Sequence, residues 1–417
     1  MRIHKFGGAS VKDAEGIRHV ASLIQDFSGD DQLIVLSAMG KTTNALEKVA
    51  ESHFTKDGEA HKHLKESKDF HQTILSELFD EKDSIYDAIN NVFVEIEWAL
   101  EDPPRDDFGF EYDQIVSQGE ILSTLILSHY LHKNNTQHQW LDVRDLVRTN
   151  NVYRNARVDW DLTVSAIQEM VKPGKLYLTQ GFLGCTSENF TTTLGREGSD
   201  YTAAIFAFAL NADEVNVWKD VPGMLNADPR FFKETTLIEN LSFYEAIELA
   251  YYGAKVIHPK TIQPLQRKSI PLRIRSFQEK NSPGTLIGEG LKQYPQVPFF
   301  IVKKDQTLVS ISSKDFAFIV EDHLSEIFAT FAKYGISVNV MQNSAISFSV
   351  CFDSKPMLFE KVLKELEAEF HVLYNHGLTM YTIRHYTADA VEKLIKGKNL
   401  VLEQKSRHTL QIVVDES

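Results

Sequence analysis

The chain has 417 residues, of which 43% are hydrophobic and 24% charged, as is ordinary for a globular protein. This length predicts two to four domains, at roughly 100–200 residues each, and the composition argues against disorder, collagen or a whole-chain coiled coil. Lys and Arg number 44 against 58 Asp and Glu, and the net charge of −14 argues against a nucleic-acid partner. No apolar run reaches about 18 residues, so we expect no transmembrane helix and no membrane partner.

The cysteine content and the first residues indicate the compartment. Cys185 and Cys351 are the only cysteines, so the chain has no disulfide framework and suits a reducing environment. The N-terminus enters a strand-like segment directly and lacks the apolar core of a signal peptide. We therefore expect a cytoplasmic protein.

The first two thirds of the chain alternate between strand and helix patterns. Residues 2–6, 32–36, 140–143, 176–179 and 214–218 read as strands, and the run at 32–36 is apolar enough to be buried on both faces. Helical patterns occupy much of the sequence between them, at 17–24, 44–101, 118–132 and 200–210. This alternation predicts an α/β fold, in which a mainly parallel sheet is sandwiched by helices.

The composition changes near residues 281–298, where Pro-rich and Gly-containing turns predict a domain boundary. Beyond it, strands at 308–312, 337–341 and 346–352 and helices at 324–334 and 355–370 follow the ferredoxin-like order, closed by a strand near 372–374. A second start supplies only strands at 378–385, 400–404 and 410–414 and a helix at 388–395, so it lacks its final helix and strand. We expect domains at 1–290, 299–376 and, in shortened form, 377–417.

The first predicted strand ends at Lys5 and Phe6 and is followed by Gly7-Gly8-Ala9-Ser10. Two glycines let backbone N–H groups approach an anion closely, and the start of the next helix favours negative charge. Lys5 would add a positive charge suited to a phosphate. The plain alternative is a glycine-rich turn with a surface lysine.

The segment at 37–44, Ser-Ala-Met-Gly-Lys-Thr-Thr-Asn, follows the second strand. It is not a P-loop, because Val35 stands where that motif needs a glycine. It does lie where open α/β sheets bind ligands, at the carboxyl end of a buried strand. A polar loop between strand and helix is the alternative.

Three acidic residues stand near predicted helix starts. Ser117 and Glu120 have the spacing of a capping box, although a carboxylate there is also suited to a substrate ammonium. Ser242 and Glu245 share that spacing, and there we expect only a cap. Asp200, which follows Arg196 in a glycine-rich stretch, either caps the next helix or belongs to a site.

Together these segments resemble the aspartate kinases of the amino-acid-kinase family, which have C-terminal ACT modules. The matching motifs occur in family order: KFGGAS at 5–10, SAMGKTTN at 37–44, VSQGE at 116–120, TQGF at 179–182, TTLGREGSD at 192–200, KDVPG at 219–223, DPR at 228–230 and YGAKVIHP at 252–259. The resemblance implies an amino-acid-kinase catalytic domain over 1–290 and ferredoxin-like βαββαβ ACT modules at 299–376 and 377–417.

The resemblance also implies the reaction and its residues. The family uses ATP and Mg²⁺ to phosphorylate the side-chain carboxylate of L-aspartate, the first step toward lysine, threonine and methionine. The implied catalytic residues are Lys5, Asp200 and Lys255, and no side chain is expected to hold the metal. The implied ATP-binding residues are Lys5, Phe6, Gly7, Gly8, Lys219, Asp220, Leu225, Arg230 and Lys255. The implied aspartate-binding residues are Ser37, Thr43, Glu120, Phe182, Arg196 and Ser199.

The guanidinium of arginine can bind a carboxylate through two hydrogen bonds, so we expect Arg196 to bind a carboxylate of aspartate. We expect Glu120 to bind the ammonium group of aspartate. Three positions depart from the family pattern, where Thr, Thr and Tyr are usual: Ala9, Lys219 and Leu225. These departures bear on nucleotide affinity and selectivity.

The tail is the expected regulatory part. The resemblance implies an amino-acid effector, lysine or threonine, at Val338, Asn339, Asn343 and Ser344, and a homodimer or higher homo-oligomer joined through the ACT modules. Asn339 stands where lysine-inhibited members are commonly acidic, so we predict weak inhibition by lysine or inhibition by threonine. The alternatives for the whole chain are a catalytically weak amino-acid sensor and another small-molecule kinase of the family.

Overall fold

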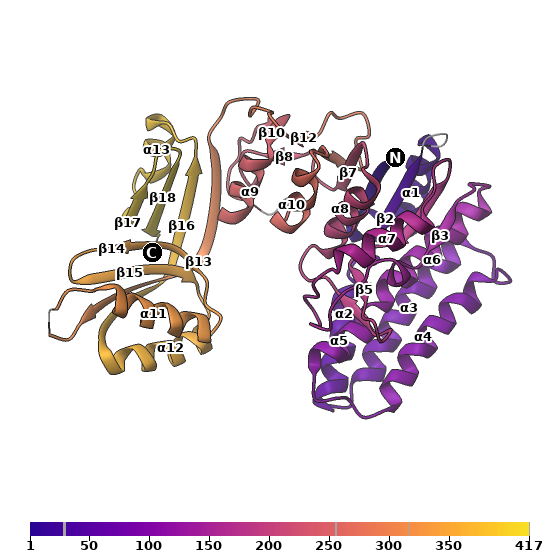
Figure 1. The fold of residues 1–417 in the computed structure, drawn as a ribbon, viewed down its shortest axis with the longest axis horizontal. Coiled ribbons are helices and arrows are strands. Elements are labelled where there is room, and N and C mark those ends of the chain that lie inside the picture. The colour runs from indigo at the N-terminus through magenta and orange to yellow at the C-terminus, as the bar shows by residue number, and fades with distance from the viewer. Residues whose placement is uncertain (28–30, 255–256, 316, 417) are drawn as a thin grey trace. The chain divides into compact units, whose positions relative to one another are not determined.

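The computed structural model describes residues 1–27, 31–254, 257–315 and 317–416. The chain divides into two compact units (Figure 1). Unit 1 comprises Met1–Met224, Leu237–Ile247 and Lys255–Tyr294, and unit 2 comprises Leu225–Thr236, Glu248–Ala254 and Pro295–Ser417. Each unit has its own sheet, and the two are described separately.

Unit 1 is built on an eight-stranded sheet with the order β10-β12-β11-β7-β1-β2-β4-β3. Six strands run parallel, and only β10 and β12 run in the opposite direction. The strands are β1 (Arg2–Phe6), β2 (Gln32–Leu36), β3 (Gln139–Leu141), β4 (Leu176–Gln180), β7 (Glu214–Lys219), β10 (Asn240–Ser242), β11 (Leu272–Ser276) and β12 (Thr285–Gly288). Every residue of β2 is buried, as its continuous apolar run predicts.

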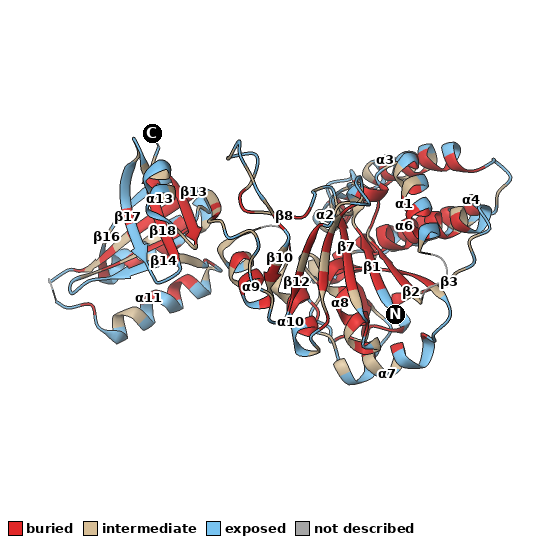
Figure 2. Ribbon diagram, turned by 90° about the horizontal axis from the view of Figure 1, so that it is seen from above, coloured by how far each residue is buried: buried red, intermediate tan, exposed pale blue. Residues whose placement is uncertain are grey.

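Helices cover both faces of this sheet (Figure 2). One face is covered by α1 (Ala14–Asp26) and α6 (Gln118–Lys133), and α3 (Ala60–Leu78) and α4 (Ile85–Glu101) pack on the outer side of these two helices. The other is covered by α7 (Trp160–Met170), α8 (Gly198–Leu210) and α10 (Pro259–Arg267). The α/β fold class with a mainly parallel sheet is therefore confirmed.

Shorter elements complete the α/β part. The helices are α2 (Thr42–Thr55), α5 (Phe108–Val116) and α9 (Phe243–Tyr252), with 3₁₀ turns η1 (Gly8–Val11) and η2 (Val143–Asp145). The short strands are β5 (Leu183–Cys185), β6 (Thr191–Thr193), β8 (Met224–Leu225) and β9 (Leu237–Ile238). At α9 the expected cap is confirmed, because the Ser242 hydroxyl accepts the Glu245 N–H at 3.1 Å.

Unit 2 contains a six-stranded antiparallel sheet with the order β14-β15-β13-β16-β18-β17 (Figure 1). Its strands are β13 (Phe299–Ser313), β14 (Val338–Asn343), β15 (Ser347–Asp353), β16 (Phe370–Arg384), β17 (Asn399–Lys405) and β18 (Thr409–Asp415). Its helices are α11 (Glu321–Lys333), α12 (Pro356–Glu369) and α13 (Ala388–Ile395). Apolar side chains of α11 and α12 pack with those of β13 and β15 in one core.

The two long strands, β13 and β16, are shared between the halves of this sheet. The second half of β13 and the first half of β16 pair with each other in the half of the sheet that also contains β14 and β15. Beyond an irregularity at Lys303–Gln306, residues 299–303 pair with 380–384, next to β18 and β17. The start of β13 thus adds a strand to the half of the sheet that holds β17 and β18.

Candidate active site

A cavity of about 580 Å³ opens at the carboxyl ends of four adjacent strands of unit 1, β7, β1, β2 and β4. From the first two predicted segments, Lys5, Gly8, Ser37 and Thr43 line it. Ligands of open α/β sheets bind at this edge, because loops from neighbouring strands converge there. Six more predicted residues also line it: Glu120, Phe182, Arg196, Ser199, Asp200 and Lys219.

Gly8 occupies a place that no other residue fits. A Cβ atom at this position would lie 2.6 Å from the carbonyl oxygen of Ala38 and 3.0 Å from that of Gly40. Both contacts are with backbone, so neither neighbour can move aside cheaply. The absence of a side chain brings the β1 loop against the loop that follows β2 and leaves the Gly8 backbone facing the cavity.

Asp200 lies between two lysines at the base of the cavity. Its Oδ1 is 2.7 Å from Lys5 Nζ, and its Oδ2 is 3.2 Å from Lys219 Nζ. Burial alone would raise the pKa of Asp200, but the two ammonium groups outweigh it and lower that pKa to about 2. The carboxylate is therefore ionised and holds two positive charges in one place.

Asp200 does not cap helix α8, so that alternative is wrong. The helix begins at Gly198, its N-cap residue is Glu197, and Asp200 lies within the first turn. Glu197 has a left-handed backbone with φ of +54°, and Gly195 has φ of +80°. These two bends place the Arg196 segment along the cavity instead of in the helix.

Two helix N-termini meet at the cavity. Thr43 in the first turn of α2 and Ser199 in the first turn of α8 both line it. In the described chain, neither helix has a side chain that caps its first N–H groups. Free N–H groups and the positive end of the helix dipole favour anions, so the cavity suits phosphate and carboxylate groups.

Glu120 is the buried acid of the site. Its side chain is 3% exposed, and burial raises its pKa to about 8 although Lys5 and two backbone amides oppose the shift. Among the described residues, its Oε2 atom has no hydrogen-bond partner. A buried carboxylate oxygen of this kind is expensive to leave unpaired, so a cationic ligand group would satisfy it.

The capping box predicted at Ser117 and Glu120 is wrong. Helix α5 ends at Val116, immediately before Ser117, whose own backbone is already helical. The Ser117 hydroxyl donates to the Gln114 carbonyl at 3.1 Å instead of accepting from the next turn. The Glu120 side chain is therefore left for the cavity.

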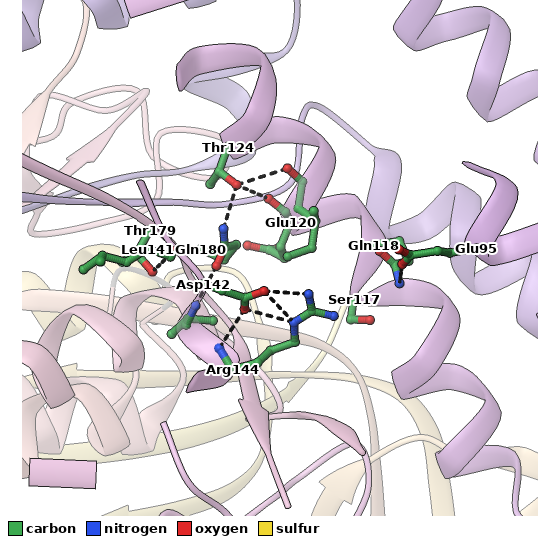
Figure 3. A network of polar contacts seen from close by, with 12 residues as sticks. Glu95, Ser117, Gln118, Glu120, Thr124, Leu141, Asp142, Arg144, Thr179 and Gln180 are labelled. Carbon is green, nitrogen blue, oxygen red and sulfur yellow. Dashed lines mark hydrogen bonds and ion pairs between the residues drawn. The ribbon is translucent and has the colours of Figure 1, made fainter. Parts of the chain in front are cut away.

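A polar network fixes the turn that presents Glu120 (Figure 3). Thr124 Oγ1 donates to the Glu120 carbonyl at 3.1 Å and accepts from Gln180 Nε2 at 2.9 Å. The Val143 N–H in turn donates to Gln180 Oε1 at 2.8 Å. Helix α6 is thereby tied to the end of β4, beside the Gly181 amide that bonds to Glu120.

Comparison with known proteins places this geometry in a family. A sequence model of the amino acid kinase family matches residues 1–276. Lysine-sensitive aspartokinase 3 of Escherichia coli (strain K12) is 33% identical over 395 residues, which cover 91% of this chain and 86% of that protein. The chain belongs to the aspartokinases of the amino acid kinase family. The family resemblance read from the motifs is therefore confirmed.

Two solved structures of this aspartokinase family share the fold. The R-state crystal structure of E. coli aspartokinase III in complex with aspartate and ADP superposes with a TM-score of 0.83 at 29% identity. The T-state structure of that enzyme in complex with lysine and aspartate gives 0.82 at 30% identity. Each superposition covers 99% of this chain and 96% of the other.

Not all residues predicted for an aspartokinase site lie at the cavity. Phe6 is fully buried, is absent from the described lining and stacks on Trp218, with ring centroids 5.6 Å apart. Gly7 and Asp220 are absent from the described lining, and Lys255 lies outside the described residues. Leu225 and Arg230 belong to unit 2, as do the predicted effector residues Val338, Asn339, Asn343 and Ser344.

Two residues of the described lining had no signal in the sequence. Tyr112 and Arg154 face the cavity, and the Arg154 guanidinium lies 4.4 Å from the centre of the Tyr112 ring. Neither belongs to a matched motif, and only the fold brings them beside Arg196. Arg196 itself is exposed and, within the described part of the chain, forms no ion pair with a carboxylate.

A helix that could span a membrane and a cluster of metal-ligand side chains are both absent from the described residues. No helix there is both long and apolar enough to cross a membrane. No group of three or more His, Cys, Asp or Glu side chains there is arranged to hold a metal ion. Both cysteines are buried and unpaired.

Proposed function

We propose that the chain transfers the γ-phosphoryl group of ATP to the side-chain carboxylate of L-aspartate, forming 4-phospho-L-aspartate and ADP. The observation that supports this most is the pairing of Lys5 and Lys219 on Asp200, in the cavity that Glu120 also lines with a buried carboxylate whose Oε2 has no hydrogen-bond partner among the described residues. The cavity thus offers positive charge for a phosphoryl group and negative charge for an ammonium. The similar E. coli enzyme has been crystallised with aspartate and ADP.

The lysine pair is assigned to the transferring phosphoryl group. An oxygen of the aspartate side-chain carboxylate attacks the γ-phosphorus, and the bond to the β–γ bridging oxygen breaks, with its electron pair leaving on ADP. Such a reaction needs positioning and charge neutralisation more than a covalent nucleophile on the enzyme. Lys5 and Lys219 neutralise the phosphoryl oxygens, and Asp200 keeps the two ammonium groups together.

The acceptor amino acid is assigned to the other side of the cavity. Glu120 accepts its ammonium, and Arg196 holds the carboxylate that does not react. Ser37, Thr43, Phe182 and Ser199 line the space between them.

The residues present fit a nucleotide-bound magnesium ion better than one held by the protein. Asp200 already holds two lysines, and Glu120 is almost fully buried. Glu197 is the third carboxylate in the lining, and in the described part of the chain these three are not grouped as metal ligands. We assign Mg²⁺ to the nucleotide phosphates, where it would offset their charge. The nucleotide roles of Lys255, Asp220, Leu225 and Arg230 remain predictions of the family resemblance.

The tail is assigned to regulation and to assembly as a homodimer or higher homo-oligomer in the cytoplasm. Asn339 is one of the four predicted effector residues, and its side chain is held by neighbours. Its Oδ1 accepts from Lys303 at 2.7 Å, and its Nδ2 donates to Gln306 at 2.8 Å and Asp353 at 3.0 Å. Because Asn339 supplies no charge, we keep weak lysine inhibition or threonine inhibition as the prediction. Titrating activity against each amino acid decides between them, and light scattering at micromolar concentration tests the assembly.

A coupled assay of ADP release tests the reaction. Rates are compared with aspartate, with glutamate and without acceptor. Release that depends on aspartate supports the proposal, and release that depends on another acceptor would support a kinase of different specificity. No release with any acceptor, together with aspartate binding, would support an amino-acid sensor and refute the proposal.

A further inference from the structure

Arg154 is a cation at the cavity that the proposed reaction has not yet used. It lies in the loop between η2 and α7 and lines the same cavity as Glu120 and Arg196. Its backbone has φ of +64°, in the left-handed region that few residues other than glycine adopt. A non-glycine residue held there is an observed strain, and strain of this kind occurs often at binding sites.

The Arg154 backbone is fixed from a buried position. Its N–H donates to Asp113 Oδ2 at 3.0 Å, and Asp113 is fully buried. The same carboxylate accepts the Thr193 N–H at 2.8 Å and the Thr193 hydroxyl at 2.7 Å. Thr193 ends strand β6, just before the segment of Gly195 and Arg196. Asp113 therefore locks the Arg154 loop to the Arg196 segment.

The Arg154 side chain is oriented by aromatic rings. Its guanidinium carbon lies 4.4 Å from the centroid of Tyr112 and 5.2 Å from that of Phe108. A ring face attracts a cation and leaves the N–H edges of the guanidinium free to bond in its plane. Arg154 is thus presented at the mouth of the cavity.

The ionic partner of Arg154 in this structure is a weak one. Its Nη2 lies 3.4 Å from Glu47 Oε1, with the arginine side chain 45% exposed and the glutamate 32%. Exposed ion pairs of this length contribute little to stability. A ligand carboxylate bound through two parallel N–H···O bonds is a stronger partner for Arg154 than Glu47 is. Such a carboxylate can therefore replace Glu47 at the guanidinium.

We propose that Arg154 is a substrate-binding residue, which together with Arg196 holds the acceptor carboxylate that is not phosphorylated. Aspartate has two carboxylates and one ammonium. Glu120 takes the ammonium and the lysine pair lies beside the reacting group, so the remaining carboxylate belongs at the arginine side of the cavity. This inference rests on the proposed function and adds a determinant of its specificity for a dicarboxylic acceptor.

The test is Arg154→Asn, because asparagine tolerates a left-handed backbone and keeps the loop conformation. We expect the KM for aspartate to rise roughly 10- to 50-fold, as for loss of a charge-assisted hydrogen bond. The KM for ATP should stay within about twofold, and kcat within about threefold, because the contact exists before and during transfer. Arg154→Lys keeps the positive charge but lacks the planar guanidinium. Its KM for aspartate should lie between those of the wild type and Arg154→Asn.

Two matched controls accompany it. Arg157→Asn changes an exposed arginine of the same loop, outside the described lining, and should leave both KM values unchanged. Glu47→Gln removes the competing carboxylate and should leave the aspartate KM unchanged or lower it. The α-carboxamide of aspartate lacks the charge that Arg154 would bind, so its inhibition constant should change by less than about twofold in Arg154→Asn.

The outcomes are separable. If the wild-type enzyme does not phosphorylate aspartate, the proposed function itself fails. If the wild type does and Arg154→Asn keeps its aspartate KM within about twofold, only the role of Arg154 fails. An equal loss for aspartate and its α-carboxamide would also overturn that role, because it would show a general effect on structure. Equal melting temperatures of the variant and wild type confirm that the comparison concerns binding.

Discussion

Replacing Asp200 by asparagine tests the centre of the site. The substitution keeps the shape of the side chain but removes the charge that holds Lys5 and Lys219 at 2.7 and 3.2 Å. Two ammonium groups then remain close together without a counter-charge. We expect them to separate, which would misplace the positive charge needed for phosphoryl transfer, so kcat should fall by roughly 10²-fold or more.

The stability cost follows from the pKa of Asp200. A carboxyl group whose pKa is about 2 in the folded protein, against 3.8 when unperturbed, contributes about 2 kcal/mol to the unfolding free energy at neutral pH. Asp200 is 2% exposed, so solvent screens this contribution little. Removing one partner from a buried ion pair commonly costs about 3–5 kcal/mol. We therefore expect the substitution Asp200→Asn to lower the free energy of unfolding by about 2 to 5 kcal/mol.

The sign of the pH dependence is fixed by the direction of the shift. Because the folded-state pKa of Asp200 is depressed, its contribution is complete above about pH 4 and is lost as the pH falls toward 2. The difference in unfolding free energy between wild type and Asp200→Asn should be constant from pH 7 to pH 5. It should then shrink as the pH falls below about 4.

Urea unfolding at several pH values, with kcat measured on the same preparations, checks both effects. Asp213→Asn is the matched control, because Asp213 pairs with the N-terminal amine at 2.7 Å but its side chain is 73% exposed. The free energy of unfolding of Asp213→Asn should fall by less than about 1 kcal/mol, and its kcat should stay unchanged. An Asp200→Asn protein as stable and as active as wild type would refute the reasoning.

Two other variants separate the acceptor groups. Arg196→Ala should raise the aspartate KM by about tenfold or more while the ATP KM stays unchanged, and an unchanged aspartate KM would remove Arg196 from the clamp. Glu120 binds an ammonium only as a carboxylate, so with its pKa near 8 the kcat/KM for aspartate should rise with pH and level off above about 8. Glu120→Gln should lower kcat/KM and abolish that rise, and a profile still present in the variant would assign it to another group.

The sequence predicted best those elements whose signal is local. Strands β1 and β2 lie at the expected residues, because β1 is followed directly by two glycines and β2 is a short apolar run that ends at a serine. Helix α13 also lies where it was expected, at Ala388–Ile395. Ten of the predicted site residues converge on one cavity, because motifs at the carboxyl ends of neighbouring parallel strands must meet there.

The features that escaped prediction depend on contacts between distant segments. Residues 299–303 became part of strand β13 by pairing with 380–384, and no local pattern shows such a pairing. Ser117 fits a capping box by spacing, yet α5 ends immediately before it and leaves no free helix start to cap. Arg154 reaches the cavity only through a left-handed backbone held by Asp113, which composition and periodicity do not reveal.

Direct detection of the product tests the central claim. An acyl phosphate reacts with hydroxylamine to give a hydroxamate, so the purified enzyme is incubated with ATP, Mg²⁺, aspartate and hydroxylamine. We predict an aspartyl hydroxamate at the side-chain carboxylate, formed only when ATP is present and reduced by several orders of magnitude in Lys5→Ala. ADP release without any hydroxamate, or an equal yield from Lys5→Ala, would contradict the account.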